Sequence, residues 1–106
     1  MKDKSEIIVN KIRLLLKQKV HSFRGLYFFG SRAKQVQQKY SDYDIAVILD
    51  EDITWQRKDE VRNLVYDIML EYDIIIDIHV YSVKEFINPS TPFRSSIKSE
   101  GIFYGI

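Results

Sequence analysis

Two aspartates stand two positions apart at the start of an apolar segment, in the sequence SDYDIAV. In an extended strand Asp42 and Asp44 would point to the same face, with alpha carbons roughly 6.5–7 Å apart. Carboxylates this close repel each other unless a cation lies between them. Such oxygen pairs suit Mg²⁺, which keeps waters and substrate phosphates as further ligands. The spacing predicts a magnesium site, although simple turn chemistry would explain the two acids if they stood alone.

A Gly-Ser pair precedes these acids and follows another apolar segment. Gly30 would let backbone approach a ligand closely, and Ser31, just before a short helix, would present N–H groups and a hydroxyl. A strand-ending glycine and a helix cap are compatible with that role. The pair therefore predicts a phosphate cradle facing the acids, which is the minimum equipment for handling a nucleoside triphosphate. For Arg32, a phosphate contact and a solvated position fit equally well, whereas Lys34 fits the surface better.

A third acid, Asp77, lies in the almost wholly apolar run IIIDIHV at residues 74–80. An unpaired carboxylate in such surroundings is costly to ionise, so it should be protonated or meet a cation. If this strand lies beside the Asp42 strand, Asp77 would complete a three-carboxylate site able to hold two metals about 3.5–4 Å apart. A protonated or locally paired acid is the alternative. His79 shares the face of Asp77 and could support or ligate the metal, although plain packing explains it more readily.

The elements that must position these residues follow from apolar periodicity and capping signals. Asp3 and Glu6 have the spacing of a capping box. The expected elements are a helix at 4–19, a strand at 24–29, a short helix at 31–38, a strand at 43–49, a helix of about five turns ending near Tyr72 and capped by Asp52 or Thr54, a strand at 74–80, a short helix after Ser82, and a helix at 92–100.

The order of these elements constrains the sheet. The phosphate cradle ends one strand and the acids begin the next, so these two strands should run antiparallel. A helical crossover should place the third strand parallel to the second. The sequence therefore predicts an α/β (α+β) fold with a small mixed sheet of three to four strands flanked by helices. The apolar tail at 102–106 either folds back onto the core or is presented to a partner.

Composition narrows the class of protein. The 106 residues predict one domain, 1–106, with a modest core. The net charge of +1 gives no broad attraction to nucleic acid or membrane, so neither is expected as a partner. The absence of cysteine excludes disulfides and thiolate zinc sites. Charges recur through the N-terminal apolar stretch, unlike a signal peptide, and no apolar run could span a bilayer, so a cytoplasmic location is predicted.

The combination of GSRA, SDYDIAV and a lone later aspartate resembles the minimal nucleotidyltransferases of the DNA polymerase beta superfamily, over nearly the whole chain. The resemblance implies a nucleotidyltransferase palm-like fold in which Gly30 and Ser31 grip the triphosphate. It also implies that Asp42 and Asp44 bind the nucleotide-associated and catalytic Mg²⁺ ions. Asp77 would join the second ion and help to deprotonate the attacking hydroxyl. Gln35 replaces a glycine frequent in the family and would narrow the loop or alter the approach of the sugar or base.

The resemblance further implies in-line attack by a hydroxyl on the alpha-phosphorus of ATP, with pyrophosphate leaving. Stand-alone domains of this kind are similar to antitoxins of HEPN/MNT toxin–antitoxin pairs, which transfer AMP to a tyrosine of a HEPN toxin. The expected partners are thus ATP and such a toxin. A catalytically silent antitoxin that acts by contact and a small-molecule nucleotidyltransferase, such as one acting on aminoglycosides, are the alternatives. The sequence leaves the base, the acceptor and an oligomeric state open.

Overall fold

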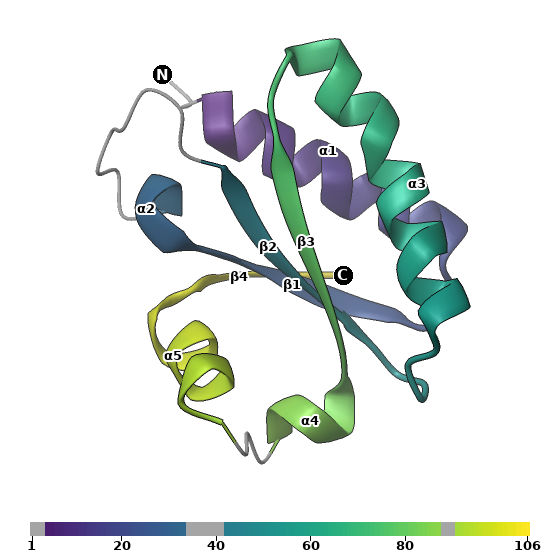
Figure 1. Ribbon diagram of the computed structural model, residues 1–106, viewed down its shortest axis with the longest axis vertical. Coiled ribbons are helices and arrows are strands. Elements are labelled where there is room, and N and C mark those ends of the chain that lie inside the picture. Colours follow the sequence, from purple (N-terminus) through teal and green to yellow (C-terminus); the bar gives the residue numbers. More distant parts are fainter. Residues whose placement is uncertain (1–3, 34–41, 88–90) are drawn as a thin grey trace.

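The computed structural model describes residues 4–33, 42–87 and 91–106, except for the side chains at 31 and 32. Its helices are α1 (Lys4–Lys19), α2 (Gly30–Ala33), α3 (Trp55–Tyr72), α4 (Val83–Ile87) and α5 (Pro92–Glu100), and its strands are β1 (Phe23–Phe29), β2 (Tyr43–Leu49), β3 (Ile76–Ser82) and β4 (Ile102–Gly105). Within these residues the strands form one sheet in the order β3-β2-β1-β4, with helices packed on it (Figure 1). The predicted mixed α+β fold is confirmed.

Strand directions follow the sequence prediction. β1 and β2 are antiparallel, and the crossover through α3 makes β3 parallel to β2. The C-terminal tail folds back, because β4 pairs antiparallel with β1 at the edge of the sheet. Arg13 of α1 also donates a hydrogen bond to the Gly105 carbonyl at 3.0 Å. Of the two expectations for the tail, the structure supports packing onto the sheet.

The two faces of the sheet are covered by different helices. In Figure 1, α1 and α3 lie above and to the right of the sheet, and α4 and α5 lie below it. Alternation along β2 sends Ile45, Val47 and Leu49, all fully buried, into the core that includes α1 and α3. The opposite face carries a smaller cluster made of Ala46, Ile48, Phe86 and Ile97. The sheet therefore has one face built around a large core and one that is only partly covered.

Most boundaries agree with the sequence, and one difference has a local cause. The helix at 4–19 and the strand at 43–49 have the predicted bounds. β3 begins at Ile76 rather than at 74, because Asp73 adopts a left-handed backbone (φ 53°) at the end of α3. The Ile74 N–H then donates to the Met69 carbonyl at 3.1 Å, so it closes the helix and is not free for the sheet.

Helix caps occur where the sequence offers hydroxyl groups. Thr54 accepts a hydrogen bond from the Arg57 N–H at 3.2 Å, and Thr91 accepts one from Arg94 at the same distance. Ser82 and Glu85 exchange hydrogen bonds before α4, as in a capping box. The Asp3 cap, Lys34, Gln35 and most of the helix expected at 31–38 lie outside the described residues. Among the described helices, none has both the length and the apolarity needed to cross a membrane.

Candidate active site

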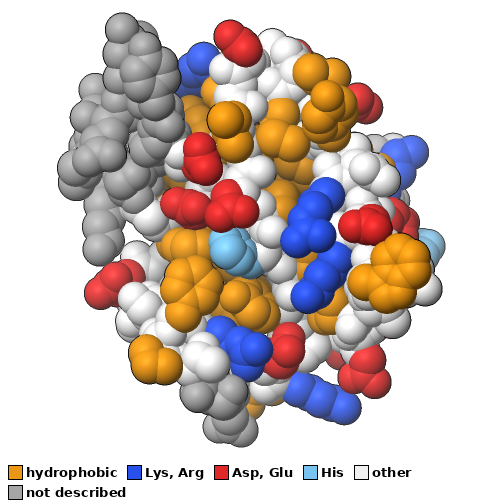
Figure 2. Space-filling view, viewed as in Figure 1, with side chains coloured by type: hydrophobic (Ala, Val, Ile, Leu, Met, Phe, Trp, Pro, Cys, Tyr) orange, Lys and Arg blue, Asp and Glu red, His pale blue; other side chains and the backbone are white. Residues whose placement is uncertain are grey.

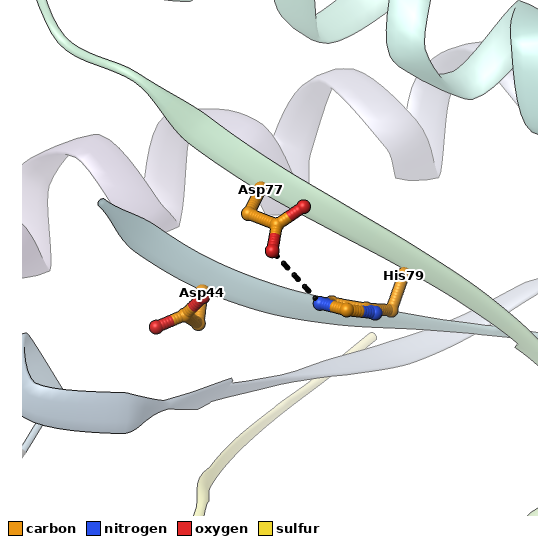
Figure 3. Close-up of side chains that lie close together, drawn as sticks. All are labelled: Asp44, Asp77 and His79. Carbon is orange, nitrogen blue, oxygen red and sulfur yellow. Dashed lines mark hydrogen bonds and ion pairs between the residues drawn. The ribbon is translucent and has the colours of Figure 1, made fainter.

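The strands β2 and β3 bring two of the predicted acids together. Their parallel register places Asp44 directly beside Asp77. Because the flanking residues Ile45, Ile76 and Ile78 are buried in the large core, alternation turns Asp44 and Asp77 to the opposite face. His79, two residues beyond Asp77, lies on that same face, and Figure 3 shows the three side chains converging from the two strands. The register and the alternation thus gather these three polar side chains on one face of the sheet.

The distances within this group suit a metal ion. Asp44, Asp77 and His79 each offer one ligand atom, and these atoms lie within 4.8 Å of one another. His79 Nε2 is 3.2 Å from Asp77 Oδ2. Figure 2 shows acidic side chains gathered against a histidine at the molecular surface. Two carboxylate oxygens and one imidazole nitrogen form a donor set that fits a divalent metal.

Asp77 lies in more polar surroundings than its sequence neighbours suggest. The side chain is 52% exposed to solvent, so the expected cost of ionising an acid among isoleucines does not arise. The reason is alternation, because Ile76 and Ile78 point into the core while Asp77 points to the partly covered face. The sequence prediction of an apolar setting for this carboxylate was wrong, whereas its placement beside the Asp42–Asp44 strand agrees with the structure.

Asp44 is the more enclosed of the two acids. Burial raises the pKa of its carboxyl, and the negative charges of Asp77 and Asp42 raise it further, while His79 acts in the opposite direction. A bound cation would relieve this repulsion. Asp42 itself is exposed, precedes β2 and lies outside the group of three ligand atoms. Of the three predicted acids, the structure therefore brings two together and leaves the third at the edge.

Gly30 has a role that the sequence did not reveal. Its backbone has a positive φ of 82°, which side chains rarely tolerate. A Cβ atom built there would collide with Asp44 Oδ2, so the residue at this position must be glycine for Asp44 to keep its place. In the structure a carboxylate approaches this glycine, and the predicted approach of a phosphate stays a prediction. Ser31 and Arg32 follow in the backbone of α2, and their side chains lie outside the described part.

The sequence favours plain packing for His79, and the ring does pack, with centroids 5.6 Å from those of Phe29 and Phe93. The same ring also places Nε2 against Asp77. The period-two spacing of Asp77 and His79 was the available signal. A cavity of about 240 Å³ adjoins this group, and it is lined by Phe29, Gly30, Ala33, Phe93, Ser96, Ile97 and Glu100.

Known proteins share this fold. The sequence matches the family model described as "Polymerase beta, Nucleotidyltransferase" over residues 10–102. The structure resembles a chain in a crystal structure of the toxin–antitoxin MntA–HepT, with a TM-score of 0.63 and 20% identity, covering 95% of this chain and 73% of that chain. No curated protein is similar enough in sequence to count as a match.

Two further solved structures resemble the chain. One is a toxin–antitoxin with AMP-PNP, with a TM-score of 0.63 and 21% identity, covering 92% of this chain and 73% of that chain. The other is a tri-AMPylated Shewanella oneidensis HEPN toxin in complex with its MNT antitoxin, with a TM-score of 0.58 and 19% identity, covering 96% and 73%. Together with the family match, these likenesses confirm the resemblance seen in the motifs. The chain belongs to the polymerase beta nucleotidyltransferase family, and its enzyme class is that of a nucleotidyltransferase.

Proposed function

We propose that this protein transfers AMP from ATP to a tyrosine hydroxyl of a HEPN-type toxin and thereby acts as its antitoxin in the cytoplasm. The convergence of Asp44 and Asp77 on one face, in a chain of the nucleotidyltransferase family, carries this proposal. The choice of acceptor is supported by the shared fold of an MNT antitoxin that was crystallised with an AMPylated HEPN toxin.

The acids have separate tasks in this proposal. Asp44 and Asp77, with Asp42 on the triphosphate side, would hold the divalent ions of a two-metal site. When bound, these ions supply charge stabilisation for the triphosphate and favour the ionised nucleophile. The sequence prediction assigns Mg²⁺, the usual companion of ATP phosphates. The donor set fits this class of ion, because hard carboxylate oxygens from β2 and β3 face one another.

The chain's own residues position the reactants. The backbone at Gly30 and Ser31 would grip the triphosphate, and Asp77 would take the proton of the tyrosine hydroxyl. The tyrosine oxygen attacks the alpha-phosphorus, the bond to the beta-phosphate oxygen breaks, and pyrophosphate leaves. The protein forms no covalent intermediate, so positioning and electrostatics supply the rate enhancement.

The test is transfer of AMP to the cognate toxin. Purified protein, ATP, Mg²⁺ and the toxin should give toxin species heavier by one or more AMP groups in intact-mass spectrometry. The double variant Asp42→Ala/Asp44→Ala should abolish these species. Asp67→Ala removes an exposed acid of α3 and should leave them unchanged. AMP addition by the double variant at the wild-type rate would exclude this site as the catalytic centre.

Neutralisation by contact alone is the second candidate, and exposed apolar groups favour it. Phe103 of β4 is 54% exposed, and Ile106 beyond it is 62% exposed. Apolar groups at a surface suit a protein partner. If the double variant still neutralises the toxin in a growth assay without adding AMP, contact explains the antitoxin effect. If neutralisation is lost together with AMP transfer, catalysis explains it.

A further inference from the structure

The imidazole of His79 is held in a fixed orientation by aromatic rings. Phe29 and Phe93 lie against it, and the Tyr81 ring is parallel to it within 4° at a centroid distance of 6.5 Å. The side chain is only 28% exposed, compared with 52% for Asp77. A ring packed in this way has little freedom to lose when it binds a ligand. Its Nε2 atom points toward the carboxylate of Asp77, as Figure 3 shows.

The hydrogen bond between His79 and Asp77 does not remove the repulsion between the two carboxylates, Asp44 and Asp77. His79 Nε2 lies at 3.2 Å from Asp77, and this contact leaves Asp44 facing a second carboxylate. The ligand atoms of these residues lie within 4.8 Å of one another, so small side-chain rotations would let one divalent ion contact all three. The arrangement therefore suits an ion that accepts both oxygen and nitrogen ligands.

We propose that Asp44, Asp77 and His79 bind a first-row divalent transition metal in preference to Mg²⁺, with His79 Nε2 as a direct ligand. Mg²⁺ is a hard ion that favours oxygen ligands, whereas imidazole nitrogen raises the affinity for the ions from Mn²⁺ to Zn²⁺. Mg²⁺ remains the companion of the ATP phosphates. The inference rests on the proposed function, because the same two carboxylates are assigned to catalysis, and it adds the identity of the ion that the protein itself selects.

Metal binding without ATP tests the proposal independently of turnover. Metal-free protein is titrated with Co²⁺ by visible absorption, and with Mn²⁺ and Mg²⁺ by calorimetry. Co²⁺ and Mn²⁺ should bind at least about tenfold more tightly than Mg²⁺. His79→Phe keeps a ring among Phe29, Phe93 and Tyr81 but removes the nitrogen, and it should weaken Co²⁺ binding by about tenfold or more while leaving Mg²⁺ binding unchanged. His79→Asp supplies an oxygen and should shift the preference toward Mg²⁺.

The second histidine of the chain provides the control. His21 precedes β1 and lies outside the metal group, so His21→Phe should bind every ion as the wild type does. In wild-type protein, trace Mn²⁺ should broaden the imidazole resonances of His79 in NMR spectra and spare those of His21. This measurement needs no variant, so a folding defect in His79→Phe cannot obscure the result.

Several outcomes would overturn the inference. They are equal affinities for Mn²⁺ and Mg²⁺, no metal binding at all, wild-type Co²⁺ binding by a folded His79→Phe variant, or equal broadening of both histidines. Any of these can occur while AMP transfer still requires Asp44 and Asp77, so the proposed function would survive. Conversely, AMP transfer that is indifferent to both carboxylates would refute the proposed function even if the metal preference were observed.

Discussion

The two faces of the sheet differ sharply although the same strands supply both. The face that packs on α1 and α3 receives fully buried aliphatic side chains such as Ile45 and Val47. The face toward α4 and α5 receives Asp44, Asp77 and His79, with a small apolar cluster farther along β2. Because successive residues alternate, one strand can stabilise the fold with one set of positions and arrange ligands with the other. We therefore expect that substitutions on the core face change mainly the stability, and that substitutions of the polar residues on the other face change mainly the activity.

Replacing an acid of the polar face should give the largest effect, and only on activity. If the proposed function holds, Asp77→Asn should lower AMP transfer by at least about 100-fold, because a metal ligand, the role proposed for Asp77, contributes several kcal/mol to the transition state. The side chain is 52% exposed, so the free energy of unfolding should change by less than about 0.5 kcal/mol. Transfer rates and urea unfolding measure the two quantities, with Asp67→Asn on α3 as the control. A large loss of stability in Asp77→Asn would contradict the expectation that the polar face contributes little to folding.

Truncating the core face should have the opposite signature. Ile45→Ala removes a fully buried side chain and should lower the free energy of unfolding by roughly 2–5 kcal/mol. Ile48→Ala, on the other face, truncates a side chain of the smaller cluster and should cost about 2 kcal/mol, the low end of that range. Urea denaturation of both variants gives the comparison. Equal losses would mean that the small cluster stabilises the fold as much as the large core.

Replacing Gly30 should affect both the stability and the activity. Gly30→Ala introduces a Cβ at a positive φ and against Asp44 Oδ2, so it should cost at least about 1–2 kcal/mol of stability and also reduce AMP transfer. Adding Asp44→Ala removes the colliding carboxylate and should restore part of the stability without restoring activity. A double-mutant cycle from thermal unfolding measures this coupling. Strictly additive losses would show that the contact between Gly30 and Asp44 is unimportant.

The two threonine caps allow the same substitution to be compared on the two faces of the sheet, with a smaller expected effect. Thr54 caps α3 and Thr91 caps α5, each through a 3.2 Å hydrogen bond. Replacing either threonine by alanine should cost about 1 kcal/mol or less of local helix stability. Amide hydrogen exchange should show Thr54→Ala lowering protection around the large core and Thr91→Ala lowering it only in α5 and nearby. Loss of protection throughout the sheet in the Thr91 variant would contradict this division.

The smallest expected effect is the pH dependence of stability due to Asp44. Its pKa is raised by burial first, and then by the charges of Asp77 and Asp42. The native state therefore binds more protons than the unfolded state above an unfolded pKa of about 4, and stability falls as pH rises through the folded pKa. Asp44→Asn lacks this loss, so in chelator its stability relative to wild type should increase from pH 3 to pH 7. A difference that does not vary with pH would contradict this origin.

Local signals in the sequence were sufficient for most of the fold. Apolar periodicity defined α1 and β2, and the order of the cradle and the acids gave the strand directions. The start of β3 was missed because it depends on the left-handed residue Asp73, which the apolar run at 74–80 conceals. The tail could not be assigned because pairing with β1 depends on residues about eighty positions earlier, where sequence patterns give no register.

The sequence predicted that Asp44 and Asp77 lie side by side, but not the further contacts of the candidate site. Alternation placed Asp77 and His79 on one face, yet the exposure of Asp77 depends on which helices cover that face. The approach of Asp44 to Gly30 and the aromatic rings around His79 are contacts between distant segments. Such contacts follow from tertiary packing, so composition and spacing do not reveal them.

The turn after α3 affects the geometry of the candidate site, although Asp73 does not belong to that site. A slip of β3 by two residues against β2 would keep every isoleucine on its proper side, so burial alone discriminates poorly between the two registers. Such a slip would nevertheless carry Asp77 roughly 6.5–7 Å along the strand and away from Asp44. The length of the helix-to-strand connection, fixed by the left-handed residue and its hydrogen bond to Met69, therefore sets the distance at which the two acids meet.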